Sequence, residues 1–326
     1  MAIHDNIAVL LLFFVVHLLI GFALMMRTGR KLWLWTIMES AAGDIARRLN
    51  RGGRSDSDRI VRGAVVFMVM TGIAYGCGRL WALMSAGNWG WAADFLLLSG
   101  ALSAMTPIAV MRGAARRLAE HKEDRARAII AAHLREDVRS ADVHTLTRKA
   151  IEYGMESLCL MLVGPALAFV VFGAPGVFVY VTVMAQHRVY GRGVPSQQHF
   201  GATVRAAERL VNLVPAAVTA VLIAAAAAVV SRGKPVVALS LPVRQAKGDD
   251  SFNRGVVVSA AAGGLGLTLG GPRRWMDGET SRGEWMGTGK DTARTDPAAL
   301  QRAGMLGFVA FLIFVLAFSA VFMMRV

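Results

Sequence analysis

Two glutamates, Glu152 and Glu156, have the residue type and spacing best suited to chemistry in this sequence. Residues four apart lie on the same face of a helix, so the two carboxylates should lie side by side. Paired carboxylates can hold a metal ion or accept a proton. On spacing alone, a second interpretation stays open, in which both side chains simply face water at a membrane surface.

Asn212 is a second candidate polar ligand. It starts an apolar stretch, and Pro215 follows closely behind it. An amide at this position could take part in a site inside the protein. Because asparagine is also a preferred helix cap, a purely structural capping role is an equally good interpretation.

Glycines gather between Gly263 and Gly271, but they match neither common nucleotide-binding motif. The P-loop needs a Gly-Lys-Ser/Thr ending, and the dinucleotide fingerprint needs a strand before it and a helix after it. Taken alone, these glycines indicate close helix packing. Arg273 and Arg274 follow directly after them, and arginine pairs well with phosphate, so an anion site at this place is a second possibility.

The glutamate pair leads into an apolar run from Leu158 to Ala185, which Gly173 to Gly176 (Gly-Ala-Pro-Gly) interrupts. Lipid offers no partners for the backbone groups that such a break sets free. One interpretation is therefore that protein or a water-filled cavity lies beside the break. The other is that a short loop joins two half-length helices at a membrane surface.

Composition places the chain among membrane proteins. Apolar residues make up 55% of its 326 residues, and the mean hydropathy is +0.48. Several apolar stretches could cross a hydrocarbon core about 30 Å thick. The predicted spans are residues 7–26, 63–83, 91–111, 158–185 (interrupted), 211–230 and 304–324.

The formal net charge of +14 is unevenly distributed. Thirty of the 36 lysines and arginines fall in residues 27–62, 112–157 and 232–303. Positive charge concentrates in cytoplasmic loops, so these three segments are predicted to be cytoplasmic and the chain to be a multi-pass protein of the cell (inner) membrane. The basic face suits a lipid bilayer with anionic lipids. No segment resembles a nucleic-acid-binding module, so nucleic acid is not an expected partner.

The predicted fold class is all-α: a polytopic helical membrane protein, with residues 1–326 forming one integral membrane domain. The polar segment 112–157 should form amphipathic cytoplasmic helices, because its apolar residues recur at helical spacing. Residues 232–303 are rich in helix-breaking residues and are predicted to be a loop-rich cytoplasmic insertion. Three histidines, His121, His133 and His144, are spaced unlike a helical metal pair and suggest a solvated face, so no metal site is assigned.

Three blocks of the sequence together resemble the CobD/CbiB family of cobalamin biosynthesis, the adenosylcobinamide-phosphate synthases. The first block contains Ile151-Glu152, Glu156-Ser157, Pro165, Gly173-Ala174-Pro175-Gly176 and Tyr180. The second contains Phe200-Gly201, Asn212, Pro215-Ala216 and Thr219. The third contains Ser251, Asn253, Gly255, Ala260 to Gly263 and Leu269-Gly270-Gly271-Pro272. The blocks stand in the family's order and span much of the chain.

This resemblance implies an ATP-dependent amide ligation, in which the carboxylate of adenosylcobyric acid is joined to the amine of aminopropanol phosphate. It implies ATP and Mg²⁺ as cofactors, and a corrinoid and aminopropanol phosphate as the substrates bound. The oligomeric state is left open. The catalytic residues it implies are Glu152, Glu156, Asp137 and Asn212. The residues it implies for substrate or phosphate binding are Ser251, Asn253, Gly255, Gly270, Gly271 and Arg273.

The sequence departs from the family pattern at several places where the family carries aspartates or other polar residues. Those places hold Leu160, Val181, Met184, His187 and Glu208-Arg209. Leucine, valine and methionine offer neither the oxygen ligands that Mg²⁺ needs nor the cationic donors that phosphate needs. A second reading is therefore kept: a noncatalytic membrane paralogue, an AmpE-like regulatory or scaffold protein.

Overall fold

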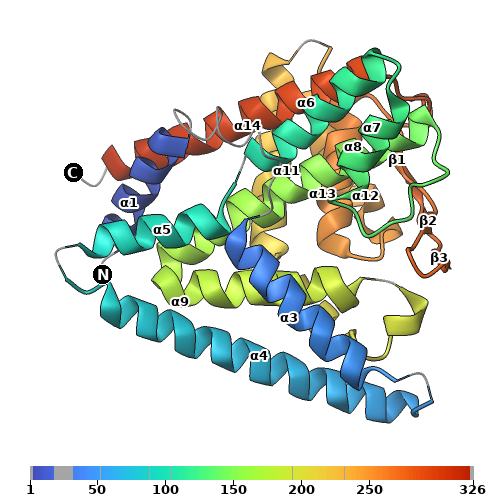
Figure 1. Ribbon diagram of the computed structural model, residues 1–326. Helices are drawn as coiled ribbons and strands as arrows, with labels where there is room; N and C mark the ends of the chain where they lie inside the picture. Colours follow the sequence, from blue (N-terminus) through green and yellow to red (C-terminus); the bar gives the residue numbers. More distant parts are fainter. Residues whose placement is uncertain are drawn as a thin grey trace.

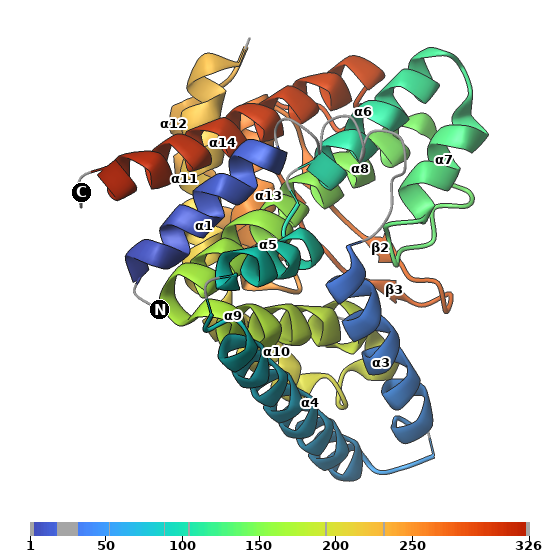
Figure 2. The same cartoon turned by 60° about the vertical axis from the view of Figure 1, so that its left-hand side comes forward.

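The computed structural model describes residues 3–17, 32–51, 53–87, 89–103, 105–192, 194–230 and 232–323. Within these residues the chain is a bundle of helices (Figures 1 and 2). The helices of the first half are α1 (Ile3–Val16), α3 (Trp33–Leu49), α4 (Asp56–Met84), α5 (Gly90–Ala101), α6 (Met105–Ala119), α7 (Glu123–Ala131) and α8 (Val143–Leu158). The remaining α-helices are α9 (Gly164–Gln186), α10 (Ala202–Val211), α11 (Leu213–Val229), α12 (Pro235–Gln245), α13 (Phe252–Leu265) and α14 (Pro297–Met323).

Shorter elements connect these helices. Two π-helical turns, η2 (Cys159–Val163) and η3 (His187–Gly191), flank α9, and the 3₁₀ turns η4 (Pro195–Gln197) and η5 (Ala246–Gly248) lie further along the chain. Two small antiparallel ladders follow α13. In the first, β1 (Leu269–Gly270) pairs with β4 (Trp285–Met286); in the second, β2 (Arg273–Arg274) pairs with β3 (Thr280–Ser281). The registers place Leu269 opposite Met286 and Arg273 opposite Ser281.

The all-α membrane fold predicted from the sequence is confirmed. Among the described residues four helical segments are long and apolar enough to cross a membrane, or five if a bent pair counts as one span. The four segments are Asp56–Met84, Gly90–Ala119, Val143–Gly191 and Pro297–Val321. The bent pair is α10 and α11, which meet at an angle of 53°. The predicted spans 63–83 and 158–185 fall within these segments, and the predicted spans 211–230 and 304–324 overlap them except at their last residues.

Two predicted spans need further description. The span predicted at 91–111 falls within the candidate segment Gly90–Ala119, in which α5 ends at Ala101, α6 begins at Met105, and the hydroxyl of Ser103 accepts from Thr106 N–H at 3.0 Å. Of the span predicted at 7–26, the structure describes α1, which is too short to cross a membrane by itself, while the rest of that prediction lies outside the described residues.

The interrupted run folds back on itself and forms a helical hairpin. Gly173 takes φ 62° and ψ −150°, a conformation open essentially to glycine alone. The helical halves before and after it pack closely: a Cβ on Gly164 would lie 1.9 Å from the hydroxyl of Tyr180. Figure 1 shows α9 returning beside the element that precedes it. The break therefore joins two helical halves, as one of the sequence interpretations proposed.

The backbone groups freed at the break find a partner in α1. The side-chain amide of Asn6 donates to the carbonyl oxygen of Phe169 at 3.0 Å and to that of Val170 at 3.4 Å. Asn6 is only 3% exposed. In an unbroken helix these two carbonyls would accept from residues 173 and 174. A protein side chain thus supplies hydrogen bonds to the backbone carbonyls at the break, as the other sequence interpretation required.

The two longest polar segments both contain helices. The segment 112–157 forms helices as predicted, and most of its α8 is buried. Residues 232–303 contain α12 and α13 before their loops begin, and α13 is buried along most of its length against α11 and α12. Small residues allow this close packing, since a Cβ on Gly255 would lie 2.1 Å from the carbonyl oxygen of Ala246.

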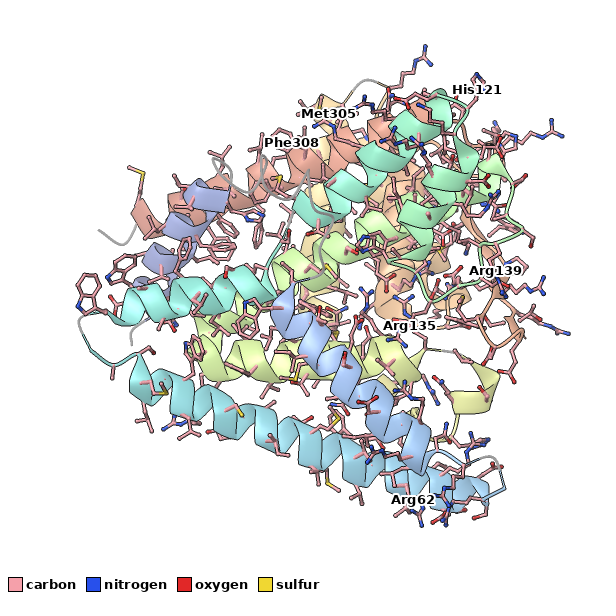
Figure 3. The ribbon with its side chains drawn as sticks, viewed as in Figure 1. Arg62, His121, Arg135, Arg139, Met305 and Phe308 are labelled. Carbon is pink, nitrogen blue, oxygen red and sulfur yellow. The ribbon has the colours of Figure 1, made fainter. Side chains whose placement is uncertain are left out.

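One large apolar core runs through the bundle from α1 to α14, and a second, smaller core joins α3, α4, η3 and α10. Polar side chains gather at one end. Figure 3 shows nitrogen-bearing side chains along its right-hand side, where Arg62, His121, Arg135 and Arg139 are labelled. All four belong to segments predicted to be cytoplasmic. Residues of the first two basic segments, although far apart in sequence, therefore lie on one side of the molecule.

Candidate functional site

A group of buried charged side chains lies where the open end of the α8–α9 hairpin meets α13 and the strands that follow it. We call it the charged cluster. Each of its members is less than a tenth exposed. The members are Glu136, Lys149, Glu152, Glu156, Asp249, Arg254 and Arg273.

Arg254 is the centre of the charged cluster. Its guanidinium donates to Glu152 Oε2 at 2.7 Å, to Glu156 Oε2 at 3.3 Å, and to Asp249. Ser251 positions it, because the Ser251 hydroxyl accepts from the Arg254 backbone N–H and caps α13. Burial alone would lower the pKa of Arg254, but Asp249 and the two glutamates raise it well above its usual value.

The two glutamates lie on one face of α8, as their spacing predicts, and both contact the Arg254 guanidinium. Glu152 also accepts from the backbone N–H of Gly270 at 2.8 Å and from Lys149 Nζ at 3.2 Å. Glu156 pairs with Arg192, which comes from the returning half of the hairpin. The hairpin therefore brings a carboxylate and a guanidinium together that are 36 residues apart in sequence.

Asp249 lies directly before α13 and holds two arginines. Arg254 and Arg273 both donate to it, and the backbone N–H of Ser251 donates to it at 3.1 Å. Burial opposes its charged form, but the two guanidinium groups outweigh that effect and lower the pKa of Asp249 to about 2. Asp249 is therefore a carboxylate throughout the physiological pH range.

Asp137, a candidate site residue, faces away from the charged cluster. Its carboxylate accepts from Arg139 at 2.8 Å, and this interaction lowers its pKa. The residue before it, Glu136, faces the cluster instead, with Lys149 Nζ at 2.8 Å. Glu136 forms an isolated β-bridge with Trp275, and successive side chains of extended backbone point to opposite sides. This alternation sends Glu136 inward and Asp137 outward.

The three candidate glycines contribute backbone rather than side-chain chemistry. Gly270 donates its N–H to Glu152, and both Gly270 and Gly271 have positive φ angles, 81° and 80°, in the turn between β1 and β2. Gly255 packs against the backbone of Ala246. Only Gly270 and Gly271 therefore lie where a close turn brings backbone to the charged cluster.

Asn212, Ser251 and Asn253 gather around Glu208. The side-chain amides of Asn212 and Asn253 donate to Glu208 Oε1 at 3.3 Å and 3.0 Å, and the Ser251 hydroxyl donates to Oε2 at 3.2 Å. Asn212 makes no side-chain cap to α11, and its carbonyl oxygen accepts from the Tyr180 hydroxyl at 2.9 Å. The structure therefore does not show the capping role, and the Asn212 side chain instead contacts Glu208 and Tyr180.

A further ion pair flanks the charged cluster. Arg188, from η3, donates to Glu39 on α3 at 2.9 Å and also to the backbone oxygen of His133 at 3.3 Å. The guanidinium lies 5.9 Å from the ring centre of Trp35, within the range of a cation–π contact. His133 itself is 8% exposed and contacts Tyr153 at 3.3 Å, which differs from the solvated face suggested by its sequence context.

Two narrow hollows adjoin Arg254 and Glu156. The first has about 340 Å³ of space when the open solvent at its mouth is included, of which about 10 Å³ is open to a water molecule, and five of its eleven lining residues are lysine or arginine. Its cations are Arg135, Lys149, Arg188, Arg192 and Arg254. The second hollow encloses about 230 Å³ and is lined by Glu156, Cys159, Leu160, His187, Glu208, Asn212, Ser251, Asn253, Arg254 and Val257. Arg135, which lines the first hollow, lies on the polar side of the molecule in Figure 3.

Sequence reasoning overlooked several residues of the site, above all Arg254, Asp249, Glu136 and Glu208. Arg254 stands between two candidates, Asn253 and Gly255, and its position inside that block was the available signal. Glu208 was counted among the departures from the family pattern, although glutamate keeps the carboxylate. Asp249 and Glu136 lie outside the quoted blocks, and only tertiary contacts bring them to Arg254 and Lys149.

The arrangement does not fit a metal ion held by the protein alone. Among the residues that the structure describes, no three His, Cys, Asp or Glu side chains are grouped to bind one. The carboxylates of the charged cluster converge on guanidinium and ammonium groups instead. No catalytic step is therefore assigned to a metal ion bound by these residues alone.

Comparison with known proteins gives consistent matches. The family model described as CobD/Cbib protein matches residues 14–323. A Sinorhizobium protein named "Cobalamin biosynthesis protein CobD" is 29% identical over 277 residues, which is 81% of this chain and 85% of that protein. Proteins of the same name from Brucella anthropi and Brucella suis are 29% identical over 211 residues (64% of each chain) and 34% identical over 151 residues (45% and 46%). No solved structure matches the chain.

Proposed function

The chain belongs to the CobD/CbiB protein family, and on that premise we propose that it is a membrane-bound ligase of cobalamin biosynthesis. The proposed reaction joins adenosylcobyric acid to aminopropanol phosphate through an amide bond and yields adenosylcobinamide phosphate. The names of the relatives support the pathway, while the choice of reaction rests on the family resemblance in the sequence.

The proposed chemistry needs two steps. In the first, the γ-phosphoryl group of ATP is transferred to the corrinoid carboxylate, which gives an acyl phosphate and ADP. In the second, the amine attacks the acyl carbon, the amide C–N bond forms, and inorganic phosphate leaves with its C–O bonding electrons. The second step requires an amine that has lost its ammonium proton. A site for this reaction must therefore offer cations for phosphate and an acceptor for a proton.

The observation that carries the proposal is the convergence of candidate residues on one buried polar site. Glu152, Glu156, Asn212 and Ser251 come from different parts of the sequence and lie within contact of Arg254 or Glu208. Burying charged groups is costly unless they are paired. A helical bundle held together only by apolar packing would therefore not be expected to contain such a site. The basic side chains of the first hollow could bind phosphate groups of ATP or of the substrate.

ATP and Mg²⁺ belong to the proposal as cosubstrate and cofactor. Mg²⁺ commonly keeps most of its ligands from water and nucleotide phosphates, with one or two protein carboxylates. The carboxylates of the charged cluster are all paired with arginine or lysine side chains. No residue of the cluster is therefore assigned as a ligand of Mg²⁺. What the protein supplies is cationic side chains such as Arg192 and Lys149.

We also propose that the membrane is the cell (inner) membrane and that the polar end faces the cytoplasm. Residues of the first two basic segments lie at that end, as the positive-inside rule requires. Cytoplasmic ATP would then reach the open mouth of the first hollow without crossing the bilayer.

One observation favours the alternative, a noncatalytic paralogue that keeps the scaffold. Guanidinium and ammonium groups already neutralise the carboxylates of the charged cluster, so the network is complete without a ligand. A sensor or scaffold protein could retain such a network for stability alone.

An activity assay on the reconstituted protein distinguishes the ligase from the noncatalytic paralogue. We would purify the chain in lipid nanodiscs and supply ATP, Mg²⁺, adenosylcobyric acid and aminopropanol phosphate. The corrinoid product would then be measured by mass spectrometry and ADP by a coupled assay. The ligase predicts equal amounts of product and ADP. E156Q should lose most activity, whereas E123Q, the same change at an exposed glutamate on α7, should not. A folded wild-type protein that forms no product would support the noncatalytic paralogue.

A further inference from the structure

Glu208 differs from the other buried carboxylates at the site. Glu152, Glu156 and Asp249 each pair with an arginine. Within the described residues, neither lysine nor arginine lies within ion-pair distance of Glu208, although it is only 3% exposed. Its neighbours are neutral amide and hydroxyl groups. A buried carboxylate is expensive without a cationic partner, so this site lacks a positive charge that a ligand could provide.

The hydrogen bonds around Glu208 leave room for one more donor. A carboxylate has about four lone-pair positions. Asn212 and Asn253 occupy two on Oε1, and Ser251 occupies one on Oε2. The remaining position on Oε2 lies on the side of His187, whose Nε2 is 4.0 Å away.

That 4.0 Å separation is too long for a direct hydrogen bond, yet it suits a ligand nitrogen. A nitrogen about 2.8 Å from each atom would be within hydrogen-bond distance of both, with an angle of about 90° between the two contacts. A primary ammonium could then donate one proton to Glu208 Oε2 and another to His187 Nε2. Two further buried atoms on the same wall, His187 Nδ1 and Asn253 Oδ1, have no hydrogen-bond partner in the described part of the chain.

The shape of the second hollow restricts what else the ligand carries. Leu160 and Val257 form an apolar part of its wall, suited to a short carbon chain. Glu156 and Arg254 line both hollows, and their ion pair at 3.3 Å lies between the two. The two sides of this ion pair have opposite character: a carboxylate without a cation lies on one side, and the first hollow, with Arg192 and Lys149, lies on the other.

We propose that Glu208 and His187 form the amine-binding end of the site, and that Arg254 and Arg192 receive the phosphate of the same short amino-alcohol phosphate. This assignment rests on the proposed ligase function and specifies how its amine substrate is held. Neither Glu208 nor His187 was among the site residues expected from the sequence.

The proposed positions also give the amine its reactivity. The bound ammonium transfers one proton to His187 Nε2 and becomes a neutral amine, while Glu208 keeps a hydrogen bond to it. The amine lone pair then forms the C–N bond with the acyl phosphate carbon as the C–O bond to phosphate breaks. The second amine proton leaves on the departing phosphate, which gives the amide and hydrogen phosphate.

Binding measurements with two probes test the assignment. Aminopropanol phosphate carries both the amine and the phosphate, whereas isopropyl phosphate lacks the amine. Calorimetry on nanodisc-embedded wild-type protein should show about 10- to 100-fold tighter binding of the amine-bearing probe, the range for one hydrogen-bonded charged pair. E208Q should bind isopropyl phosphate as before and lose that preference. R192Q should weaken both probes to a similar degree, and E123Q should change neither.

The outcomes separate the assignment from the proposed function. If E208Q retains the wild-type preference for the amine-bearing probe, the assignment is overturned while the ligase proposal stands. If the wild-type protein binds neither probe and makes no product, the proposed function fails and the assignment fails with it.

His187→Gln provides a second, independent test should E208Q not fold. Glutamine keeps the polarity and approximate size of His187 but cannot take up the proton. We expect H187Q to bind aminopropanol phosphate within about threefold of wild type while its turnover at saturating amine falls by about 100-fold, the scale of general base catalysis. Unchanged turnover in H187Q would remove His187 from the proton-transfer step.

Discussion

Arg254 is the single residue on which the charged cluster depends. Its guanidinium is 6% exposed and contacts carboxylates from α8 and from the turn before α13. Planar guanidinium groups suit this task, because their donors point in fixed directions that lysine cannot reproduce. The residue therefore ties together segments that are about 100 positions apart in sequence, such as Glu152 and Arg254.

Removing the Arg254 charge should destabilise the fold strongly. R254L would leave Glu152, Glu156 and Asp249 without their shared cation, and loss of one partner from a buried ion pair costs about 3–5 kcal/mol. We expect a clearly lowered thermal unfolding midpoint in detergent, measured by tryptophan fluorescence. R282L, the same change at an exposed arginine, should leave the midpoint nearly unchanged. An R254L protein as stable as wild type would show that the cluster does not support the fold.

Asp249 gives the cluster a defined response to acid. Its pKa is lowered from 3.8 to about 2 in the folded protein, so the folded state binds a proton less readily than the unfolded chain. The resulting stability, about 2 kcal/mol, is present above pH 4 and is lost as the pH falls toward 2. Unfolding free energies measured across pH 2–5 should therefore decline less steeply for D249N than for wild type. Identical slopes would contradict the assignment.

At the scale of elements, the α8–α9 hairpin shapes the site. Its break at Gly173 allows the returning half to bring His187, Arg188 and Arg192 back to the level of Glu156. Asn6 of α1 holds the carbonyls that the break leaves without helical partners. A straight helix over the same residues would place Glu156 and Arg192 more than 50 Å apart, at 1.5 Å per residue.

The hairpin predicts that Gly173 does not tolerate a side chain. G173A should be destabilised by about 1–3 kcal/mol, because alanine is strained at φ 62° and ψ −150°. Gly72 offers a matched control within α4: a Cβ there meets no atom within 4 Å, and alanine is the better helix former. G72A should therefore be neutral or slightly stabilising in the same detergent unfolding assay. Equal effects of the two changes would contradict the hairpin conformation.

At the scale of the whole molecule, two tryptophans lie at the opposite end of α4 from the basic side chains labelled in Figure 3. Arg62 and Arg139 lie at the polar end in Figure 3, whereas Trp89 and Trp91 stand beside the turn from α4 to α5, at the other end of α4. Trp89 is 77% exposed. Tryptophans favour the membrane–water interface, and basic residues favour the cytoplasmic side. The molecule is therefore polarised along the direction in which α4 crosses the membrane.

Cysteine labelling in intact cells tests this orientation. In a background lacking Cys77 and Cys159, W89C should react with a membrane-impermeant maleimide added outside. R139C and R62C should react only after the cells are permeabilised, because their positions lie at the proposed cytoplasmic end. Labelling of R139C in intact cells together with protection of W89C would reverse the proposed orientation.

The class of the protein, the helix face shared by the two glutamates and the break in the apolar run could all be predicted from the sequence. Length and apolarity were sufficient to predict membrane helices, because a bilayer imposes one thickness on every span. The spacing of Glu152 and Glu156 was sufficient to place them on one helix face, because that relation is local. The break at Gly173 was also visible, since lipid makes an interrupted helix conspicuous.

How these parts combine depends on contacts between segments that are far apart in the sequence. Arg254, Asp249, Glu136 and Glu208 became site residues through contacts between distant segments, which no local pattern encodes. The choice of Glu136 over Asp137 depended on the pairing of a single extended residue with Trp275. Whether a buried charge has a partner depends on packing. Spacing and composition therefore could not predict the ion pairs of the charged cluster. Nor could they predict that Glu208 has no cation beside it in the described residues.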